Sequence, residues 1–394
     1  MSRPVVVMKK AAVLLLTAAL TSTSAANAST APWVGEPSSV VLKGAQQLDM
    51  RSASGRTYRV FISVPDKPAP DAGYGVLYVL DGNAMFLTAV EAVRAMERRP
   101  DVPRDIATIV VGIGYPDGAD VGVERTYDLT PPGSGHPRIK AASGGADQFL
   151  AFLQDELKPY IATGRVLDSA RQGLFGHSFG GLFVLHSLQR EPEAFSHRIA
   201  ASPSIWFDRQ QLEPGLQQWA SQRPQGSAPL RVLLTAGQYE QVASAHAYTR
   251  PNVARTVDTL KERQQVDGSR ALAHVLDGAA GVSARFDEIL GEDHGSVIPA
   301  AISRAVAYML MPPIQVPPQP TARQYWEMTP EQRYDLRMWV RQLPDQQRIP
   351  WLTALRDTLQ GGLDANQRQA LHDERNRLDA AHGSAPHAVN APPR

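Results

Sequence analysis

The sequence lacks cysteine altogether, and its charges nearly cancel. Its 394 residues include no cysteine, and 40 lysines and arginines stand against 39 aspartates and glutamates. The absence of cysteine excludes disulfide bonds, thiolate metal sites, a cysteine nucleophile and a lipid anchor on an N-terminal cysteine. A formal net charge of +1 provides no basic surface for holding a phosphate backbone, so no nucleic-acid partner is expected. The hydrophobic share of 43% is that of an ordinary globular protein.

Long apolar runs are also missing, apart from a short one near the N-terminus. Arg3, Lys9 and Lys10 precede an apolar core over residues 11–20, and the small residues 26–28 (Ala-Asn-Ala) follow. This arrangement is typical of a secretory signal peptide over residues 1–28. The core is about half as long as the roughly twenty residues that a membrane span needs. We therefore expect a protein without a membrane span that is exported across the inner membrane, with the periplasm as its compartment.

Between residues 56 and 310, short β-branched apolar runs alternate with helical patterns. This alternation is the signature of an α/β fold, with a mostly parallel central sheet and helices on both faces. The expected strands are 58–64, 76–80, 106–113, 173–175, 198–201, 230–236 and 272–276. The expected helices are 84–97, 145–160, 180–190, 254–264 and 297–310.

A proline-rich stretch follows this region. Residues 312–320 contain five prolines, which cannot continue a helix and favour an extended spacer. Beyond it, Thr329 is expected to cap a helix that has Pro330 at its first position and Gln332 reaching back to the cap. The predicted domains are the following: signal peptide 1–28, α/β domain 29–311, linker 312–320, helical extension 321–382 and disordered tail 383–394.

A weak repeat runs through the helical extension. Residues 330–333 (Pro-Glu-Gln-Arg), 344–348 (Pro-Asp-Gln-Gln-Arg) and 364–368 (Asp-Ala-Asn-Gln-Arg) each open a helix-like stretch. We expect the extension to pack on the main domain or on a neighbour, and the docking of a partner is the alternative.

Residues 176–180 (Gly-His-Ser-Phe-Gly) fit the G-x-S-x-G nucleophile elbow, a sharp turn between a strand and a helix. An apolar run leads in at 173–175 and a helical pattern leads out at 181–186, as the elbow requires. The two glycines are expected where a side chain would collide with a neighbouring strand or helix while the serine backbone is strained. Ser178 is the predicted nucleophile, and a glycine-rich turn with an idle serine is the alternative.

A serine hydroxyl needs a base to take its proton, and this elbow is followed along the chain by an acid and then a histidine. His294 lies after the last expected strand and before the final expected helix, so it is the predicted base. The acid should follow the strand over 230–236, where Glu240 stands, and would hold the tautomer of the imidazole. Asp258 and Asp293 are rivals, and a Ser-His dyad without a close acid is a further alternative.

An oxyanion hole needs two backbone donors, each worth about 3–4 kcal/mol in the transition state. One should be the amide of Phe179, directly after the nucleophile, and the other should come from the loop after the strand over 76–80. Gly82 or Asn83 is the predicted second donor, with an ordinary turn as the alternative. No histidine and aspartate cluster has metal-ligand spacing, so neither a metal nor a cofactor is expected.

Seven segments, in this order and spacing, resemble the "Putative esterase" family of α/β hydrolases. The resemblance is closest to its enterochelin-esterase branch, which includes the periplasmic siderophore esterases that open catecholate trilactones. The segments are 80–83 (Leu-Asp-Gly-Asn), 112–116 (Gly-Ile-Gly-Tyr-Pro), 125–131 (Arg-Thr-Tyr-Asp-Leu-Thr-Pro), 145–160, 176–181, 201–206 (Ala-Ser-Pro-Ser-Ile-Trp) and 291–297. The resemblance covers about residues 40–310. It implies the α/β-hydrolase fold, Ser178 as nucleophile, His294 as base and the Gly82 loop as oxyanion donor.

In that branch the segment with Arg125 and Asp128 faces the substrate. The resemblance therefore implies that Arg125 binds an anionic catecholate or ferric complex through charge-assisted hydrogen bonds. The alternative is that Arg125 pairs with Asp128 and holds the loop. Trp206 is expected either to offer an aromatic wall to a catechol ring or to belong to the core.

These residues predict an exported serine carboxylic-ester hydrolase that acts through an acyl-enzyme on a siderophore ester such as a catecholate trilactone. Its partner is then a small-molecule ester, and iron arrives only with the substrate. An acyltransferase or a general carboxylesterase of the same fold is the alternative, and a non-enzymatic binding module is a third hypothesis.

Overall fold

The computed structural model describes residues 39–381 except 104–105, 134, 138, 208, 312–314 and 344. The expected signal peptide over 1–28 and the expected tail over 383–394 lie outside the described residues. The chain divides into two units at Lys43, and the fold below is that of the second unit, Gly44–Arg394.

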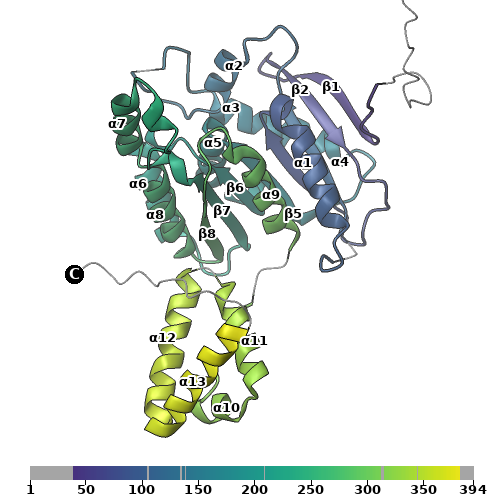
Figure 1. Ribbon diagram of the computed structural model, residues 1–394. Helices are drawn as coiled ribbons and strands as arrows, with labels where there is room; N and C mark the ends of the chain where they lie inside the picture. The colour runs from purple at the N-terminus through teal and green to yellow at the C-terminus, as the bar shows by residue number, and fades with distance from the viewer. Residues whose placement is uncertain are drawn as a thin grey trace, which may run out of the picture. The chain divides into compact units, whose positions relative to one another are not determined.

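A single sheet of eight strands forms the centre of the N-terminal part of the described chain (Figure 1). Its strand order is β1-β2-β4-β3-β5-β6-β7-β8, in which β1 and β2 pair antiparallel and the strands from β4 to β8 run parallel. The strands are β1 Ala45–Arg51, β2 Thr57–Ser63, β3 Tyr74–Leu80, β4 Thr108–Gly114, β5 Leu167–His177, β6 His197–Ala201, β7 Leu230–Gly237 and β8 Val282–Ile289. The predicted α/β class with a mostly parallel sheet is confirmed.

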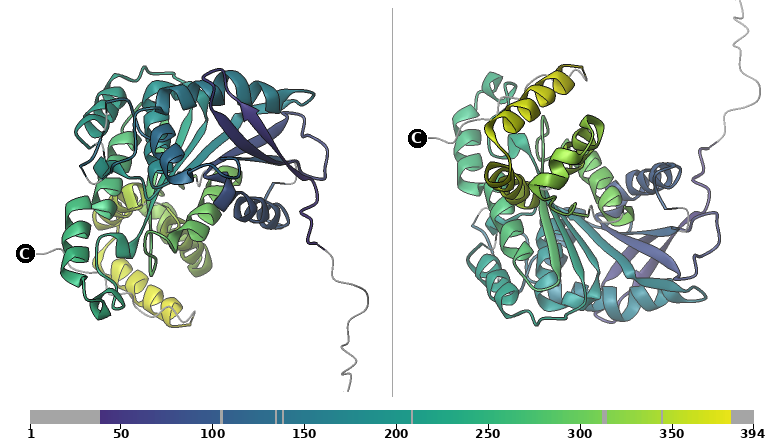
Figure 2. Two further views of the ribbon diagram at one scale, coloured as in Figure 1. Left: turned by 90° about the horizontal axis from the view of Figure 1, so that it is seen from above. Right: turned by 90° about the horizontal axis from the view of Figure 1, so that it is seen from below.

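Helices cover both faces of this sheet (Figure 2). They are α1 Gly82–Glu97, α2 Val121–Asp128, α3 Ala146–Ala151, α4 Lys158–Ala162, α5 Phe179–Arg190, α6 Arg209–Gln222, α7 Val253–Arg263, α8 Gln265–Asp277 and α9 Val297–Leu310. A π-helical segment, Phe152–Leu157, joins α3 to α4. The central strands β3 and β4 are buried almost throughout, which is why they stand out in the sequence as continuous apolar runs.

The expected strand over residues 272–276 is wrong, because these residues lie in α8. Leu272, Ala273 and Leu276 have the spacing of one helix face, and in α8 that face is buried. The strand at this end of the sheet is β8, ten residues further along the chain than the start of the expected one. A short apolar run therefore matched a strand pattern, although it belonged to a helix.

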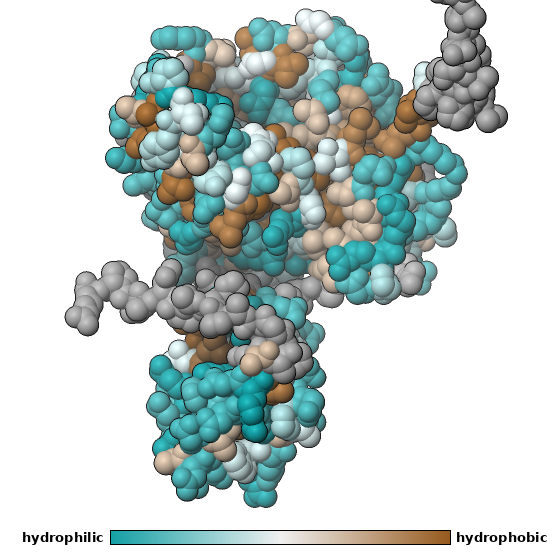
Figure 3. Space-filling view, viewed as in Figure 1, coloured by the Kyte–Doolittle hydropathy of each residue, from teal (hydrophilic) through white to brown (hydrophobic). Residues whose placement is uncertain are grey.

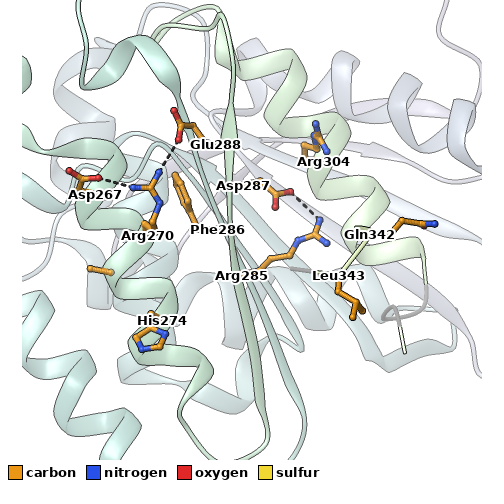
Figure 4. A pocket seen from close by; sticks show the side chains of 11 residues that line it. Asp267, Arg270, His274, Arg285, Phe286, Asp287, Glu288, Arg304, Gln342 and Leu343 are labelled. Carbon is orange, nitrogen blue, oxygen red and sulfur yellow. Dashed lines mark hydrogen bonds and ion pairs between the residues drawn. The ribbon is translucent and has the colours of Figure 1, made fainter. Parts of the chain in front are cut away.

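The strand β8 was not predicted from the sequence because several of its side chains are charged (Figure 4). Arg285 and Asp287 form an ion pair along the strand at 3.1 Å, and Arg270 of α8 reaches Glu288 at 2.8 Å. The edge position explains this composition, since charges on an edge strand oppose pairing with another chain. The cavity drawn in Figure 4 is lined by these residues and by none of the predicted catalytic ones. The other edge strand, β1, is mostly exposed and was likewise not predicted.

Four further helices form the C-terminal extension of the described chain: α10 Ala322–Glu327, α11 Pro330–Arg341, α12 Asp345–Gly362 and α13 Ala365–Ala381. They have a core of their own, made by Tyr325, Val340, Leu343, Trp351 and Leu355. The predicted capping box is confirmed: Gln332 N donates to Thr329 Oγ1 at 3.2 Å, and Thr329 N donates to Gln332 Oε1 at 2.9 Å. No helix in the described part of the chain is long and apolar enough to cross a bilayer.

The weak sequence repeat has a local structural cause. The arginine that ends each repeat, in the first turn of one helix, donates hydrogen bonds to backbone carbonyls at the end of the preceding helix. The bonds run from Arg333 to Tyr325 O (3.1 Å) and Trp326 O (3.0 Å), from Arg348 to Arg341 O (3.4 Å) and from Arg368 to Gln360 O (3.3 Å). Each repeat thus begins one helix and satisfies the unpaired carbonyls of another.

Candidate active site

Ser178 lies on the sharp turn between β5 and α5. Its backbone has φ 61° and ψ −116°, a conformation that residues other than glycine rarely adopt. A side chain at Gly176 would place its Cβ 2.3 Å from the carbonyl oxygen of Gly180, so only glycine fits there. The strand, strained serine and helix are the predicted elbow, which presents the Ser178 hydroxyl beyond the carboxyl end of the sheet.

The expectation for the second glycine of the elbow is wrong. A Cβ at Gly180 would meet nothing closer than 3.6 Å, which is ordinary van der Waals contact. The crowded position is the next one, because a Cβ at Gly181 would lie 2.8 Å from Pro203 Cα and 2.9 Å from Ala201 O. The backbone after β6 passes against the first turn of α5 at Gly181, and that approach cannot be read from the five-residue motif.

Three residues that are far apart in the chain meet at this turn. Ser178 Oγ lies 3.0 Å from His294 Nε2, and His294 Nδ1 lies 2.6 Å from Glu240 Oε2. Glu240 follows β7 and is buried, while His294 stands in the loop between β8 and α9. The geometry therefore places the predicted nucleophile, base and acid in one hydrogen-bonded series.

The two rival acids lie elsewhere. Asp258 belongs to α7, and Asp293 Oδ1 accepts the backbone amides of Gly295 and Ser296, each at 2.9 Å. Asp293 therefore shapes the loop that carries His294, and the carboxylate against the imidazole is that of Glu240.

The surroundings of Glu240 keep it ionised. Its Oε1 accepts Ser202 Oγ at 2.6 Å and the amide of Gly237 at 2.7 Å, while Oε2 faces His294. Burial opposes ionisation, yet these hydrogen bonds outweigh it and hold the pKa of Glu240 below its usual value. An ionised carboxylate only accepts hydrogen bonds, so His294 Nδ1 carries a proton and Nε2 presents its lone pair to Ser178.

Two serines just after β6 complete this network, and sequence reasoning did not assign them a role. Ser202, with φ 44°, donates to the acid, and Ser204 Oγ lies 3.2 Å from Ser178 Oγ. Ser204 is 1% exposed, and its amide also donates to Ser178 O at 3.0 Å. When Ser178 donates its one proton to His294, the Ser204 hydroxyl is left as a donor to Ser178 Oγ.

His177 supports the ring of His294 from one side. The two ring centroids are 4.6 Å apart, and His177 is buried. Burial, followed by the neighbouring His294, lowers the pKa of His177 to about 4. His177 is therefore neutral at physiological pH and adds no charge next to the base.

The predicted oxyanion donors lie at the first residues of two helices. Gly82 begins α1 directly after Asp81, whose backbone is left-handed at φ 53°, and Phe179 begins α5. Among the described residues, neither amide donates to a backbone carbonyl in a turn, loop or cap. A Cβ at Gly82 would lie 2.7 Å from Gly112 C, so the close approach to β4 requires glycine. These features suit a rigid donor pair for a developing oxyanion.

Asn83, the other predicted donor residue, ties the loop in place through its side chain. Its Oδ1 accepts Tyr115 N at 2.8 Å, and its Nδ2 donates to Tyr115 O at 2.9 Å. The first turn of α1 is thereby held to Tyr115, the residue directly after β4.

Arg125 pairs with a carboxylate other than the one considered from sequence. Its Nε and Nη2 donate to the two oxygens of Asp81 at 2.8 and 2.9 Å, and its guanidinium carbon lies 5.6 Å from the ring centroid of Phe179. The alternative of a pair with Asp128 is wrong, because Asp128 is 1% exposed and faces Arg56 at 2.9 Å. Arg125 therefore connects Asp81, which precedes the predicted donor Gly82, with Phe179, whose amide is the other predicted donor.

Trp206 belongs to an aromatic group beside the nucleophile. Its ring centroid lies 6.4 Å from that of Phe179 and 6.1 Å from that of Phe207, and the Arg263 guanidinium lies 4.2 Å above it. The ring is only partly buried. Trp206 therefore combines core packing with a surface near Ser178.

The fold and the arrangement at its carboxyl edge are those of an esterase of the α/β-hydrolase class. The family model described as "Putative esterase" matches residues 52–296 of this chain. The chain belongs to that family and is a carboxylic-ester hydrolase, which confirms the resemblance found in the sequence. Helices α10 to α13 lie outside the matched residues.

The relatives of this chain include several siderophore esterases. It is 37% identical over 266 residues to ferri-bacillibactin esterase BesA of Bacillus subtilis, covering 65% of this chain and 86% of the relative. It is 34% identical over 248 residues to siderophore enterobactin esterase of Emericella nidulans, covering 59% and 81%. Among solved structures, siderophore hydrolase EstA from Aspergillus nidulans matches with a TM-score of 0.63 and 29% identity, covering 71% and 98%.

Proposed function

We propose that this esterase is an exported serine hydrolase that opens a siderophore ester through an acyl-enzyme. The observation that carries the proposal is the hydrogen-bonded series of Ser178, His294 and Glu240 on a strained elbow. Each partner is held in the orientation that proton transfer from the serine requires.

The reaction follows from these contacts. His294 Nε2 accepts the proton of Ser178 as Oγ attacks the ester carbonyl, and the charge of Glu240 stabilises the imidazolium that forms. The amides of Phe179 and Gly82 donate to the oxyanion. His294 then gives the proton to the leaving alkoxide, and water, deprotonated by the same nitrogen, releases the acyl group from Ser178.

The substrate class rests on the relatives and on Arg125. The relatives are named for hydrolysis of siderophores, whose catecholate or ferric complexes are anionic. With Nε and Nη2 of Arg125 bound to Asp81, the nitrogen left to meet an anionic substrate is Nη1. Trp206 offers the ring face that a catechol can stack against.

Export is part of the same proposal. The charged start, apolar core and small-residue site over residues 1–28 support it. Fractionation of cells that produce the full chain tests it, because the proposal expects a shortened protein in the periplasm. Full-length protein in the cytoplasm would contradict export.

The activity is tested by giving the protein and its Ser178→Ala variant a catecholate trilactone and a p-nitrophenyl ester side by side. Products are identified by mass spectrometry, with and without an added acceptor alcohol. The proposal expects opening of the trilactone that depends on Ser178 and is much faster than cleavage of the simple ester. Cleavage of the simple ester alone would contradict the substrate, and acyl transfer to the alcohol in place of hydrolysis would contradict the reaction.

A further inference from the structure

A cavity of about 350 Å³ lies among the helices of the C-terminal extension, with lining residues from each of α10 to α13. This volume is near the lower end of the range for small-molecule sites, roughly 300–1,000 Å³. The cavity is therefore large enough for a small molecule and too small for a folded partner.

The charge of the cavity differs from that of the extension around it. Residues 321–381 carry nine arginines and nine aspartates or glutamates, so the extension as a whole is neutral. The cavity lining has one carboxylate, that of Glu374. Its arginines are Arg333, Arg337, Arg356, Arg368 and Arg375. Positive charge is concentrated in the cavity, and this favours an anionic ligand.

Two of these arginines are structural, whereas a third has unused donors. Arg333 binds Glu374 at 2.8 Å, and Arg368 donates to carbonyls at the end of α12. Arg337 has its Nε and Nη2 buried, and neither atom has a hydrogen-bond partner among the described residues. A buried donor without a partner destabilises the folded protein. Inside the extension, the charge of Arg337 is therefore not neutralised by a hydrogen-bonded carboxylate of the described residues.

The remainder of the lining is largely apolar. Leu352, Leu355 and Leu359 of α12 and Leu371 of α13 line the cavity beside the arginines. The face of the extension seen in Figure 3 is mostly hydrophilic, so this group of leucines is not typical of its surface. A bare inorganic anion would leave the leucines unused, and an uncharged apolar molecule would leave the excess positive charge of the lining without a counter-charge.

We propose that this cavity is a binding site for a small carboxylate with an apolar body, separate from the esterase site. The carboxylate pairs with the positive charge of Arg337 and the other lining arginines, and the body packs against the four leucines. The site does not depend on Ser178, because its residues all belong to α10 to α13 and the residues of the esterase site do not.

Isothermal titration of the full-length protein tests this proposal with four probes. Decanoate and 2,3-dihydroxybenzoate combine a carboxylate with an aliphatic or an aromatic body, whereas decanol lacks the charge and inorganic phosphate lacks the body. At least one carboxylate should bind with 1:1 stoichiometry and a Kd below ~1 mM. Decanol and phosphate should each bind at least about tenfold more weakly. The tighter of the two carboxylates identifies the body that the leucines accept.

Matched variants assign the binding to the cavity. Arg337→Gln should weaken carboxylate binding by about tenfold or more. The control is Arg323→Gln, because Arg323 is on α10, is mostly exposed and does not line the cavity. Leu352→Asp is a second test, since this lining residue is 44% exposed and its substitution should leave the core intact. It should also weaken binding, because it sets a carboxylate against the ligand.

Three results would overturn the proposal. The first is the absence of saturable binding of both carboxylates. The second is an unchanged Kd in Arg337→Gln and Leu352→Asp, with folding checked by circular dichroism. The third is loss of binding after an organophosphonate has blocked Ser178, which would move the ligand to the esterase site.

Discussion

Replacing Glu240 by glutamine tests the proposed hydrogen-bonded series most directly. Ser202 Oγ and Gly237 N both donate to Oε1, so the amide oxygen of the glutamine must occupy that position. Its NH₂ group then faces His294 Nδ1, where the carboxylate oxygen lay at 2.6 Å. The imidazole must then accept a hydrogen bond at Nδ1 and carry its own proton on Nε2. It can then no longer accept the proton of Ser178.

The size of the effect follows from this reversal. Holding the wrong tautomer while the geometry stays intact lowers kcat by about 10⁴ in a comparable triad. Loss of the buried charge also removes the stabilisation of the imidazolium. We therefore expect kcat of Glu240→Gln to fall by about 10³–10⁴, or roughly 4–5.5 kcal/mol of activation free energy.

The assay is steady-state hydrolysis of a p-nitrophenyl ester, together with the rate at which an organophosphonate inactivates Ser178. Both rates should fall together, since both depend on the same proton transfer. Asp293→Asn is the matched control, because it removes the nearest rival carboxylate, and it should retain far more activity than Glu240→Gln. A Glu240→Gln enzyme within about tenfold of the unmodified rate would refute the triad and favour a Ser-His dyad.

Three other perturbations follow from the site. Ser204→Ala removes the donor that lies 3.2 Å from Ser178 Oγ. The rate of organophosphonate inactivation should therefore fall by about fivefold or more, which is roughly the net free energy of one hydrogen bond. An unchanged rate would leave Ser204 without a role in the reaction. Arg125→Ala leaves the carboxylate of Asp81 unpaired next to Gly82, so kcat on a neutral ester should fall by about tenfold or more. Adding Asp81→Asn should restore part of this kcat. An effect confined to KM for anionic esters would contradict the role of Arg125 in positioning the Gly82 donor. Acid should destabilise the fold through two buried histidines. Burial lowers the pKa of His177 to about 4 and that of His197 to about 3, each below the ordinary 6.5. As the pH falls, both rings are therefore protonated in the unfolded chain before they are protonated in the folded one. Between pH 7 and pH 5 the two histidines should contribute a loss of roughly 3–4 kcal/mol, of which the raised pKa of Asp128, about 6, offsets about 1 kcal/mol. Equal stability in urea unfolding at the two pH values would refute the neutral, buried state of both rings.

Local sequence was sufficient wherever the relevant contacts are made by near neighbours. The elbow around Ser178 depends on the strand, turn and helix that adjoin it, and the capping box at Thr329 depends on a residue three positions later. The position of Glu240 after β7 follows from the order of nucleophile, acid and histidine along the chain in this fold. In these cases the pattern in the sequence and the contact in the structure involve the same few residues.

Elsewhere the sequence was misleading or silent. The run over residues 272–276 has a composition that suits a strand or a buried helix face, and β8 is too polar to stand out because it lies at an edge. The partner of Arg125 is Asp81, 44 residues away, although Asp128 is much nearer in the chain. Nothing local indicates that Ser202 and Ser204 face the acid and the nucleophile.

By itself, the sequence determined the α/β class, the elbow and the order of serine, acid and histidine along the chain, since these depend on short-range patterns and on chain order. The tertiary structure alone decided which loops meet. Parallel strands bring the ends of β3, β5, β6 and β7 to one edge of the sheet, and the strand order sets which ends are neighbours. The contacts of Asp81 with Arg125, of Ser204 with Ser178 and of Gly181 with Pro203 therefore come from packing between distant segments, which no local pattern contains.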